Sequence, residues 1–175
     1  METGFAMREA DAGNAEAIQS VARESWHAAY DGFLGAGTVD GIIDEWYALD
    51  SLRSSIRASE HHVFVATNGS PTREDSRPVG FVHGGPWTDE PRIGHLMRLY
   101  VRPDSWGRGI GTDLLERAEI ALEADGYERC RLEVFARNEN GVAFYEGRGY
   151  ERCDDVFGEL DGESYRVLFL EKKLE

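Results

Sequence analysis

The sequence predicts an α+β (mixed α/β) domain built around one sheet. Apolar residues recur at strand spacing in some segments and at helical spacing in others, and the two kinds of segment alternate along the chain. Two pairs of strand patterns flank turn-forming residues, which favours antiparallel hairpins. Between Ile93 and Phe135 a strand, a glycine-rich loop, a helix and a second strand follow one another, which favours a right-handed βαβ crossover.

The amino-terminal part carries the patterns of one strand and two helices. A short strand is expected around Ala6 to Glu9. Asn14 is a candidate N-cap for the next helix, because a short polar side chain can accept a hydrogen bond from a free amide of the first turn. Apolar residues recur at helical spacing at Ile18, Val21 and Ala22 and then, in one second helix, at Ile42, Ile43, Trp46, Tyr47 and Leu49.

Two antiparallel hairpins are expected. The segments HHVFVAT, residues 61–67, and PVGFVHG, residues 78–84, are rich in β-branched and aromatic residues and flank a polar loop. Near the carboxyl terminus, YERCDDVF and ESYRVLFLE flank Asp161 and Gly162, a dipeptide that favours a tight turn.

The segment IGHLMRLYV, Ile93 to Val101, has the strongest strand pattern, and Pro103 ends it. In a regular strand every second side chain lies on the same face, as Leu99 and Val101 do, but Leu96 is an odd number of residues from both. This break in parity indicates a β-bulge, a feature that is common beside functional sites.

A helix and a strand follow the glycine-rich stretch WGRGIG, Trp106 to Gly111, and complete the crossover. Gly126 is the expected C′ residue of that helix, and RCRLEVF, residues 129–135, is the next strand. A short helix within ARNENGVAFYEGRG then ends at Gly149. The buried face of the longer helix is expected at Leu114, Leu115, Ala118, Ala121 and Leu122.

The charge balance argues against a nucleic-acid binder. The 175 residues carry 33 acidic against 19 basic side chains, a net charge of -14, so a polyanion would be repelled. Only Lys172 and Lys173 are lysines. This acidity indicates adaptation to concentrated salt, where screening shortens the range of self-repulsion, and an ordinary acidic protein is the alternative.

Length and composition favour one domain over residues 1–175. No apolar run approaches the roughly 20 residues of a membrane helix, so no membrane partner is expected. The start METGFAMREAD has neither the basic nor the apolar region of a signal peptide, which favours a cytoplasmic protein. Residues 1–6 are expected as a disordered tail, with Met7 as a candidate start. Cys130 and Cys153 fit neither a metal site nor a disulfide framework, so no metal is expected.

The stretch WGRGIG predicts an anion site, because a strand, a glycine-rich loop and a helix start bring free amides and the positive end of the helix dipole together. A P-loop requires a lysine before its hydroxyl residue, but Thr112 directly follows Gly111. A dinucleotide fingerprint would place a third glycine where Leu114 stands. Spacing therefore disfavours both nucleotide motifs.

Arg108-Gly109-Ile110-Gly111, between a strand ending LYVRP and a helix beginning TDLLERA, resembles the coenzyme A pyrophosphate loop of the GNAT superfamily of N-acetyltransferases. That loop reads Gln/Arg-x-x-Gly-x-Gly/Ala. Gly109 and Gly111 match its small positions, whereas Trp106 stands at the Gln/Arg position, and Arg108 is one candidate for the missing positive charge. A second family motif is similar to ARNENGVAFYEGRGY, in which Asn138, Tyr145, Gly149 and Tyr150 take the motif positions.

The resemblance implies a fold and a cosubstrate. The fold would be a mostly antiparallel, twisted sheet of six to seven strands flanked by about four helices, with a V-shaped splay at strand 93–101. The cosubstrate would be acetyl-coenzyme A, held by backbone amides at the splay and in the glycine loop, without a metal. The residues implied to bind it are Leu99, Tyr100, Val101, Trp106, Gly107, Arg108, Gly109, Ile110, Gly111, Thr112, Asn138 and Tyr145.

The implied reaction transfers an acetyl group to a primary amine of a small molecule, protein or peptide, by direct attack in a ternary complex. It requires a proton acceptor, oxyanion donors and an acid for the departing thiolate. Tyr145 matches the acid of the family, and Asn138 either bonds the pantetheine or caps its helix. His95 is the candidate acceptor, with His83 and Glu133 as competitors.

Trp26, Tyr30 and His83 are the candidate contacts of the amine substrate, because aromatic faces attract cations. A non-catalytic acyl-coenzyme A-binding regulatory module of the same fold is the alternative function. Members of the family often form dimers, so the resemblance also allows a homodimer.

Overall fold

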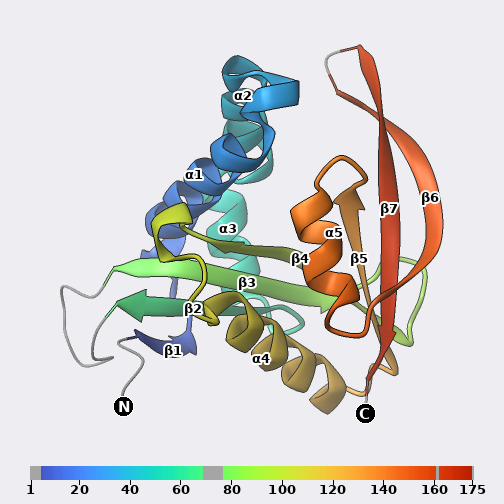
Figure 1. Ribbon diagram of the computed structural model, residues 1–175. Helices are drawn as coiled ribbons and strands as arrows, with labels where there is room; N and C mark the ends of the chain where they lie inside the picture. The colour runs from blue at the N-terminus through green and yellow to red at the C-terminus, as the bar shows by residue number, and fades with distance from the viewer. Residues whose placement is uncertain (1–4, 69–76, 161, 175) are drawn as a thin grey trace.

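The computed structural model describes residues 5–68, 77–160 and 162–174. Within these ranges seven strands form one sheet in the order β1-β2-β3-β4-β5-β7-β6, and five α-helices flank it (Figure 1). The α+β class, the strand number and both antiparallel hairpins are confirmed, with one helix more than expected. The bounds are β1 Phe5–Glu9, α1 Ala15–Leu34, α2 Ala36–Trp46, α3 Leu49–Arg57, β2 His62–Asn68, β3 Pro78–Pro86, β4 Ile93–Val101, α4 Ile110–Ala124, β5 Arg129–Phe135, α5 Glu139–Glu146, β6 Glu151–Leu160 and β7 Glu163–Lys173.

The segment expected to form one second helix forms two helices, α2 and α3. It breaks after Trp46, and Ala48 takes an extended conformation with ψ 137° before α3 begins. Tyr47, at the break, is buried, and its carbonyl accepts a hydrogen bond from Gln19 Nε2 at 2.9 Å. A side chain of α1 therefore satisfies a carbonyl at the C-terminal end of α2, where the helix itself leaves carbonyls without partners.

Two expectations near the amino terminus differ from the structure. Residues 1–4 of the expected tail lie outside the described residues, whereas Phe5 and Ala6 already pair with β2. Asn14 precedes α1 without capping it. Its side chain instead accepts the backbone N–H of Asp11 at 2.9 Å and closes a capping box around a short 3₁₀ turn.

The sheet has a buried layer on each face. Phe64 and Ala66 pack with α4, while Val65 between them packs with α1 to α3, as alternation along a strand requires. Glycines let α4 approach the sheet closely: a Cβ at Gly80 would lie 3.1 Å from Leu114 Cδ1. The α4 side also includes α5, whose Val142 joins the same cluster.

The strand β4 contains the expected bulge. On β3, His83 pairs with Arg98 and Gly84 pairs with Leu96, so Met97 is the additional residue on β4. On its other side β4 pairs with β5 in parallel, but only from Ile93–Arg129 to His95–Arg131. Both strands continue beyond this point and diverge, which confirms the splay.

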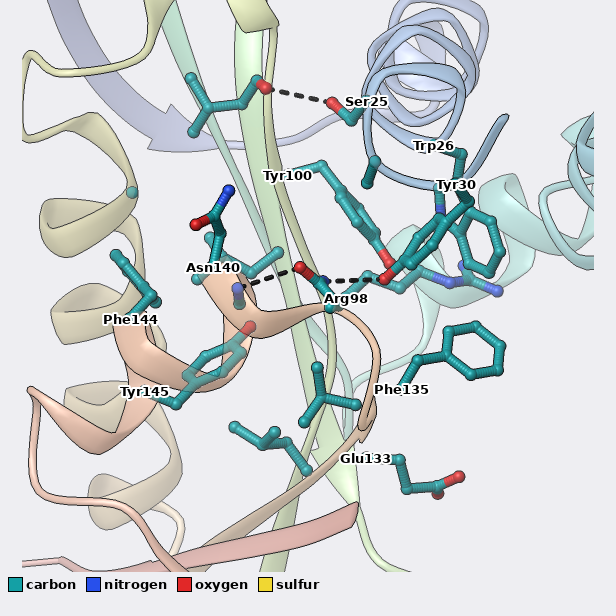
Figure 2. Close-up of a pocket in the computed structure, with 18 of the residues that line it drawn as sticks. Ser25, Trp26, Tyr30, Arg98, Tyr100, Glu133, Phe135, Asn140, Phe144 and Tyr145 are labelled. Carbon is teal, nitrogen blue, oxygen red and sulfur yellow. Dashed lines mark hydrogen bonds between the residues drawn. The ribbon is translucent and has the colours of Figure 1, made fainter. Parts of the chain in front are cut away.

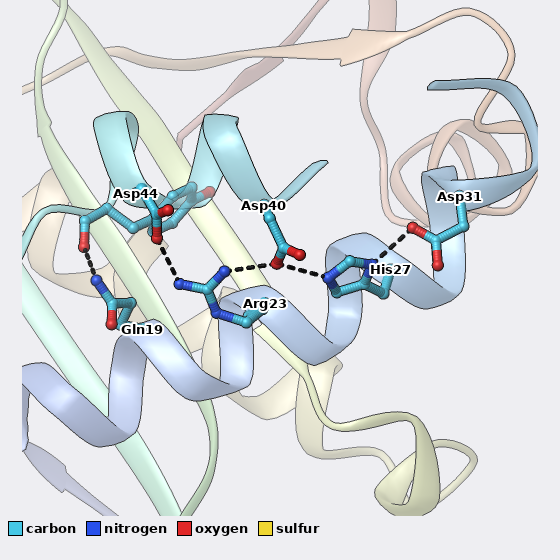
Figure 3. A network of polar contacts seen from close by, with 7 residues as sticks. Gln19, Arg23, His27, Asp31, Asp40 and Asp44 are labelled. Atoms are coloured by element: carbon cyan, nitrogen blue, oxygen red, sulfur yellow. Dashed lines mark hydrogen bonds and ion pairs between the residues drawn. The ribbon is translucent and has the colours of Figure 1, made fainter. Parts of the chain in front are cut away.

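An ionic clasp joins α1 to α2 (Figure 3). Arg23 binds Asp40 at 2.6 Å and Asp44 at 2.7 Å. His27 lies between two carboxylates, with Nε2 2.9 Å from Asp40 and Nδ1 2.7 Å from Asp31. Hydrogen bonds to Asp40 and then to Asp31 raise the pKa of His27, because they favour the imidazolium.

The clasp predicts a pH-dependent cost of His27→Gln. Because folding raises the pKa of His27, its contribution is fully present below the unfolded value of about 6.5 and is lost as the pH rises through the folded pKa. Urea unfolding at pH 6 and at pH 9 measures this. The variant should lose more stability, relative to the parent, at pH 6 than at pH 9, and an equal loss at both would contradict the ionic role.

Candidate active site

A cavity of about 1080 Å³ opens where β4 and β5 diverge. It extends from the loop before α4, along the free edge of β4 and past α5, to β5 and the tip of the β6–β7 hairpin. Figure 2 shows the part of its lining between Tyr100, Tyr145 and Glu133. Its volume is at the upper end of ordinary ligand cavities, so it can hold a long ligand together with a second small molecule.

The backbone of β4 offers amides to this cavity. The N–H of Arg102 donates to Val79 O at 2.7 Å, so the alternate residues Tyr100 and Arg98 also direct their polar groups toward β3. Leu99 and Val101 direct theirs toward the gap. The amide of Tyr100 therefore does not face the cavity as the family resemblance implied, although its side chain lines the wall.

The carbonyl of Val101 accepts two hydrogen bonds. One comes from Ser25 Oγ at 3.0 Å and the other from the indole Nε1 of Trp106 at 2.7 Å. Trp106 thereby fixes the glycine loop to the end of β4, while 55% of the residue remains exposed. A neutral donor thus stands where the family motif has a glutamine or an arginine.

The glycine loop and the start of α4 form a cradle of amides. Gly107 and Gly109 have φ of 78° and 80°, a region that residues with a Cβ rarely adopt. The first helical hydrogen bond runs from Asp113 N–H to Gly109 O, so the preceding amides, those of Ile110, Gly111 and Thr112, have no partner within the helix. Free amides at the positive end of a helix dipole are the arrangement that binds anions in other proteins.

Two arginines lie near the cradle, and only one of them lines the cavity. Arg108 is exposed and is not among the lining residues. Arg148, from the turn after α5, lines the cavity and donates to Thr112 Oγ1 in the first turn of α4. Sequence analysis missed Arg148, which stands between the two motif residues Gly149 and Tyr145.

Tyr145 projects from α5 into the cavity (Figure 2). Its ring packs edge-on against Phe144 and Tyr150, with centroids 5.2 and 5.6 Å away. Its hydroxyl has no hydrogen-bond partner within the described ranges. Burial raises the pKa of Tyr145, so the phenol keeps its proton at neutral pH and remains a donor.

Asn138 caps α5 and joins it to α1. Its Oδ1 accepts the N–H of Gly141 at 3.0 Å, and its Nδ2 donates to the hydroxyl of Tyr30 at 2.9 Å. Both of its polar groups thus have protein partners. Tyr30 is 3% exposed, and burial raises its pKa to about 12.

Trp26 and Tyr30, the candidate substrate contacts, line the cavity as part of an aromatic cluster. Their rings lie 4.6 Å apart, and Trp26 donates to the hydroxyl of Tyr47 at 3.3 Å. Both residues are buried, so they form a rigid wall with their polar groups already bonded.

The structure brings His95 to the cavity but not His83. His83 is 2% exposed, bonds to His61 at 2.8 Å and is absent from the cavity lining. His95 lines the cavity under the ring of Trp87, with Nε2 3.8 Å from Glu133 Oε1. Burial, followed by the charge of Arg98, lowers the pKa of His95 to about 4, so its imidazole is neutral at pH 7.

Glu133 and Glu159 bring carboxylates to the far part of the cavity, from β5 and β6. Burial raises the pKa of Glu133. Glu159 was not expected from the sequence, because only the folding of the β6–β7 hairpin brings it here. In the described part of the chain, no group of three His, Cys, Asp or Glu side chains could hold a metal, and no helix is long and apolar enough to cross a membrane.

The chain is similar to known acetyltransferases. The model of the acetyltransferase (GNAT) family matches residues 19–150. The spermidine N(1)-acetyltransferase of Thermoplasma acidophilum is 30% identical over 164 residues, which are 91% of each chain. The crystal structure of the PaiA N-acetyltransferase of the same organism in complex with coenzyme A superposes with a TM-score of 0.79, 28% identity and 99% coverage of both chains. A GCN5-related N-acetyltransferase of Rhodopseudomonas palustris shares the fold, with a TM-score of 0.73, 21% identity and coverage of 97% and 95%.

Proposed function

The chain belongs to the GNAT family of acetyltransferases, and from that premise we propose that it acetylates a primary amine of a small molecule by direct attack in a ternary complex. In its wider form, the proposal also includes an amine of a protein or peptide as the acceptor. The observation that carries it is one continuous cavity that joins the amide cradle of α4, the free edge of β4 and the Tyr145 hydroxyl.

The residues that would hold acetyl-coenzyme A follow the length of the cavity. The amides of Ile110, Gly111 and Thr112 fit an anionic pyrophosphate. The amides of Leu99 and Val101, directed into the gap, fit the carbonyl groups of the pantetheine and of the acyl group. An amide held in place before the reaction stabilises negative charge on the acyl oxygen without reorganisation. The bound cosubstrate supplies an acyl group activated as a thioester.

Tyr145 acts on the leaving sulfur in this proposal. A thiol has a pKa near 8.5 and a free phenol one near 10, and burial raises that of Tyr145 further. Complete proton transfer to the thiolate is therefore less favourable than from an exposed tyrosine. A hydrogen bond donated by the phenol still stabilises the developing thiolate, and this is the larger part of its role.

His95 accepts the proton of the amine in this proposal. An alkylamine arrives as an ammonium ion with a pKa near that of lysine, about 10, and must lose a proton before it can attack. The neutral imidazole of His95 can accept it, but with a pKa of about 4 it holds the proton only briefly. Glu133, whose Oε1 lies 3.8 Å from His95 Nε2, is beyond direct hydrogen-bond distance and would receive the proton through one bridging water.

The far part of the cavity fits a cationic acceptor. Glu133 and Glu159 supply negative charge, and Trp46 and Phe135 supply aromatic faces. A polyamine is the first candidate, because it carries a reactive amine and a second cation, and because the 30% identical relative is named a spermidine acetyltransferase.

An amine panel tests the function. Purified protein with acetyl-coenzyme A should release free thiol with spermidine or a related polyamine faster than with amino acids, peptides or no amine. Thiol release with peptides alone would indicate that the acceptor is an amine of a protein and not of a small molecule. Binding of coenzyme A without thiol release for any amine would favour the non-catalytic regulatory module.

For Tyr145→Phe, we expect turnover to fall roughly tenfold or more, because the hydrogen bond to the developing thiolate is lost, while coenzyme A binding is kept. Tyr150→Phe is the matched control, because its hydroxyl donates to Glu119 at 2.8 Å rather than lining the cavity. Steady-state kinetics and calorimetric binding measure both. Unchanged turnover in Tyr145→Phe would remove it from the mechanism.

For the proton acceptor, His95→Gln and Glu133→Gln are compared across pH. Loss of the imidazole should lower kcat/KM at every pH and remove the acidic limb expected near pH 4. Glu133→Gln should have the smaller effect, since it only receives the proton from His95. A His95→Gln profile that keeps its acidic limb would assign the role to another group.

A further inference from the structure

We propose that Arg148 supplies the side-chain positive charge that binds the pyrophosphate of coenzyme A, in place of the residue that the family motif has at position 106. The inference rests on coenzyme A as the cosubstrate and not on the identity of the amine. It assigns a ligand-binding role to a residue outside the glycine loop.

The glycine loop itself offers no positive side chain to the cavity. Trp106 is neutral, and its only donor is already bonded to Val101 O. Arg108 is exposed and lies off the cavity lining. The amide cradle alone would have to neutralise a doubly charged pyrophosphate.

The guanidinium of Arg148 is held over the cradle by three side-chain hydrogen bonds. Nε and Nη2 donate to Thr112 Oγ1 at 3.0 and 2.6 Å, and Nη1 donates to the carbonyl of Phe144 at 2.9 Å. Cζ lies 3.8 Å from the centroid of the Phe144 ring, which supports the group from one face. The position of the charge is therefore set before a ligand binds.

These bonds leave donors for a ligand. A guanidinium has five N–H groups, so three bonds leave one on each terminal nitrogen. Two such donors on a planar group suit a pair of phosphate oxygens. Thr112, which anchors the group, is also one of the residues whose backbone amide is free at the start of α4.

The net negative charge of the chain makes a positive side chain at the cavity important for binding an anion. The chain has a net charge of -14, so its field opposes an anionic cosubstrate. Arg148 forms no ion pair within the described ranges, so a carboxylate of this part of the protein does not neutralise it. The other two lining arginines are placed elsewhere, Arg98 over the ring of Tyr47 and Arg137 over that of Phe33.

Calorimetry with two ligands and turnover with a third test the proposal. Coenzyme A and dephospho-coenzyme A both carry the pyrophosphate, but only the first carries the 3′-phosphate. For Arg148→Gln, the loss of charge-assisted hydrogen bonds should weaken binding of both by the same factor, roughly tenfold to a hundredfold. Turnover with S-acetylpantetheine, which has no phosphate, should change less than twofold. Arg148→Lys should recover part of the affinity.

Arg108→Gln is the matched control, since it removes one positive charge beside the same loop. It should bind coenzyme A within about twofold of the parent, and a larger loss there than in Arg148→Gln would overturn the assignment. A loss for coenzyme A alone would place Arg148 at the 3′-phosphate and also overturn it.

A structural role predicts a different pattern. If Arg148 only holds α5 against α4, then Arg148→Gln would impair S-acetylpantetheine turnover as strongly as coenzyme A binding, and Thr112→Val would reproduce both effects. That result would overturn the proposal. Failure of the parent protein to turn over any amine, with coenzyme A binding intact, would count against the proposed function. The calorimetric comparison of Arg148→Gln with Arg108→Gln, for coenzyme A and dephospho-coenzyme A, would still test the Arg148 proposal.

Discussion

Hydrogen bonding between the parallel strands β4 and β5 ends at the pair His95–Arg131. The candidate active site exists because the two strands separate beyond this pair. Met97 bulges out of β4 just beyond it, while β4 remains paired with β3 as far as Val101. One edge of β4 is therefore left free at the centre of a sheet, where a strand normally has two partners. The free edge provides amides, the space beside it becomes the cavity, and the end of β4 sets the position of the glycine loop and of α4.

Several separate elements are fixed to this edge. Val101 O accepts hydrogen bonds from Ser25 of α1 and from Trp106 of the loop. Away from this edge, Asn138, the N-cap of α5, donates to Tyr30 of α1. The cavity walls are therefore joined across the opening by hydrogen bonds between side chains far apart in sequence. Proton donors and acceptors that face the opening, such as Tyr145 and His95, are held by packed aromatic rings instead.

Local patterns predicted much of the fold, including the glycine loop that precedes α4. The parity change between Leu96 and Leu99 indicated the bulge, and glycine spacing separated this loop from nucleotide loops. Contacts between distant segments could not be predicted. The carbonyl of Tyr47, where the second helical segment breaks, is bonded by Gln19 of α1. His83 is buried in β3 and so does not reach the cavity. Arg148 meets Thr112 because α5 packs beside α4. A sequence pattern supplies the residue types, and the tertiary fold decides which of them share a site.

The short β4–β5 pairing also has a mechanical consequence. Three residue pairs join the two parts of the sheet, so few ladder hydrogen bonds oppose a movement of one part against the other. The helix α4 stiffens it, since Leu122 lies against Gly84 and Gly94 on one side while the same helix packs with Leu132 of β5 on the other. The same helix presents the free amides of Ile110, Gly111 and Thr112 at its first turn. A ligand bound at this turn and along β4 would therefore contact both the helix that bridges the two parts of the sheet and the free edge of one of them.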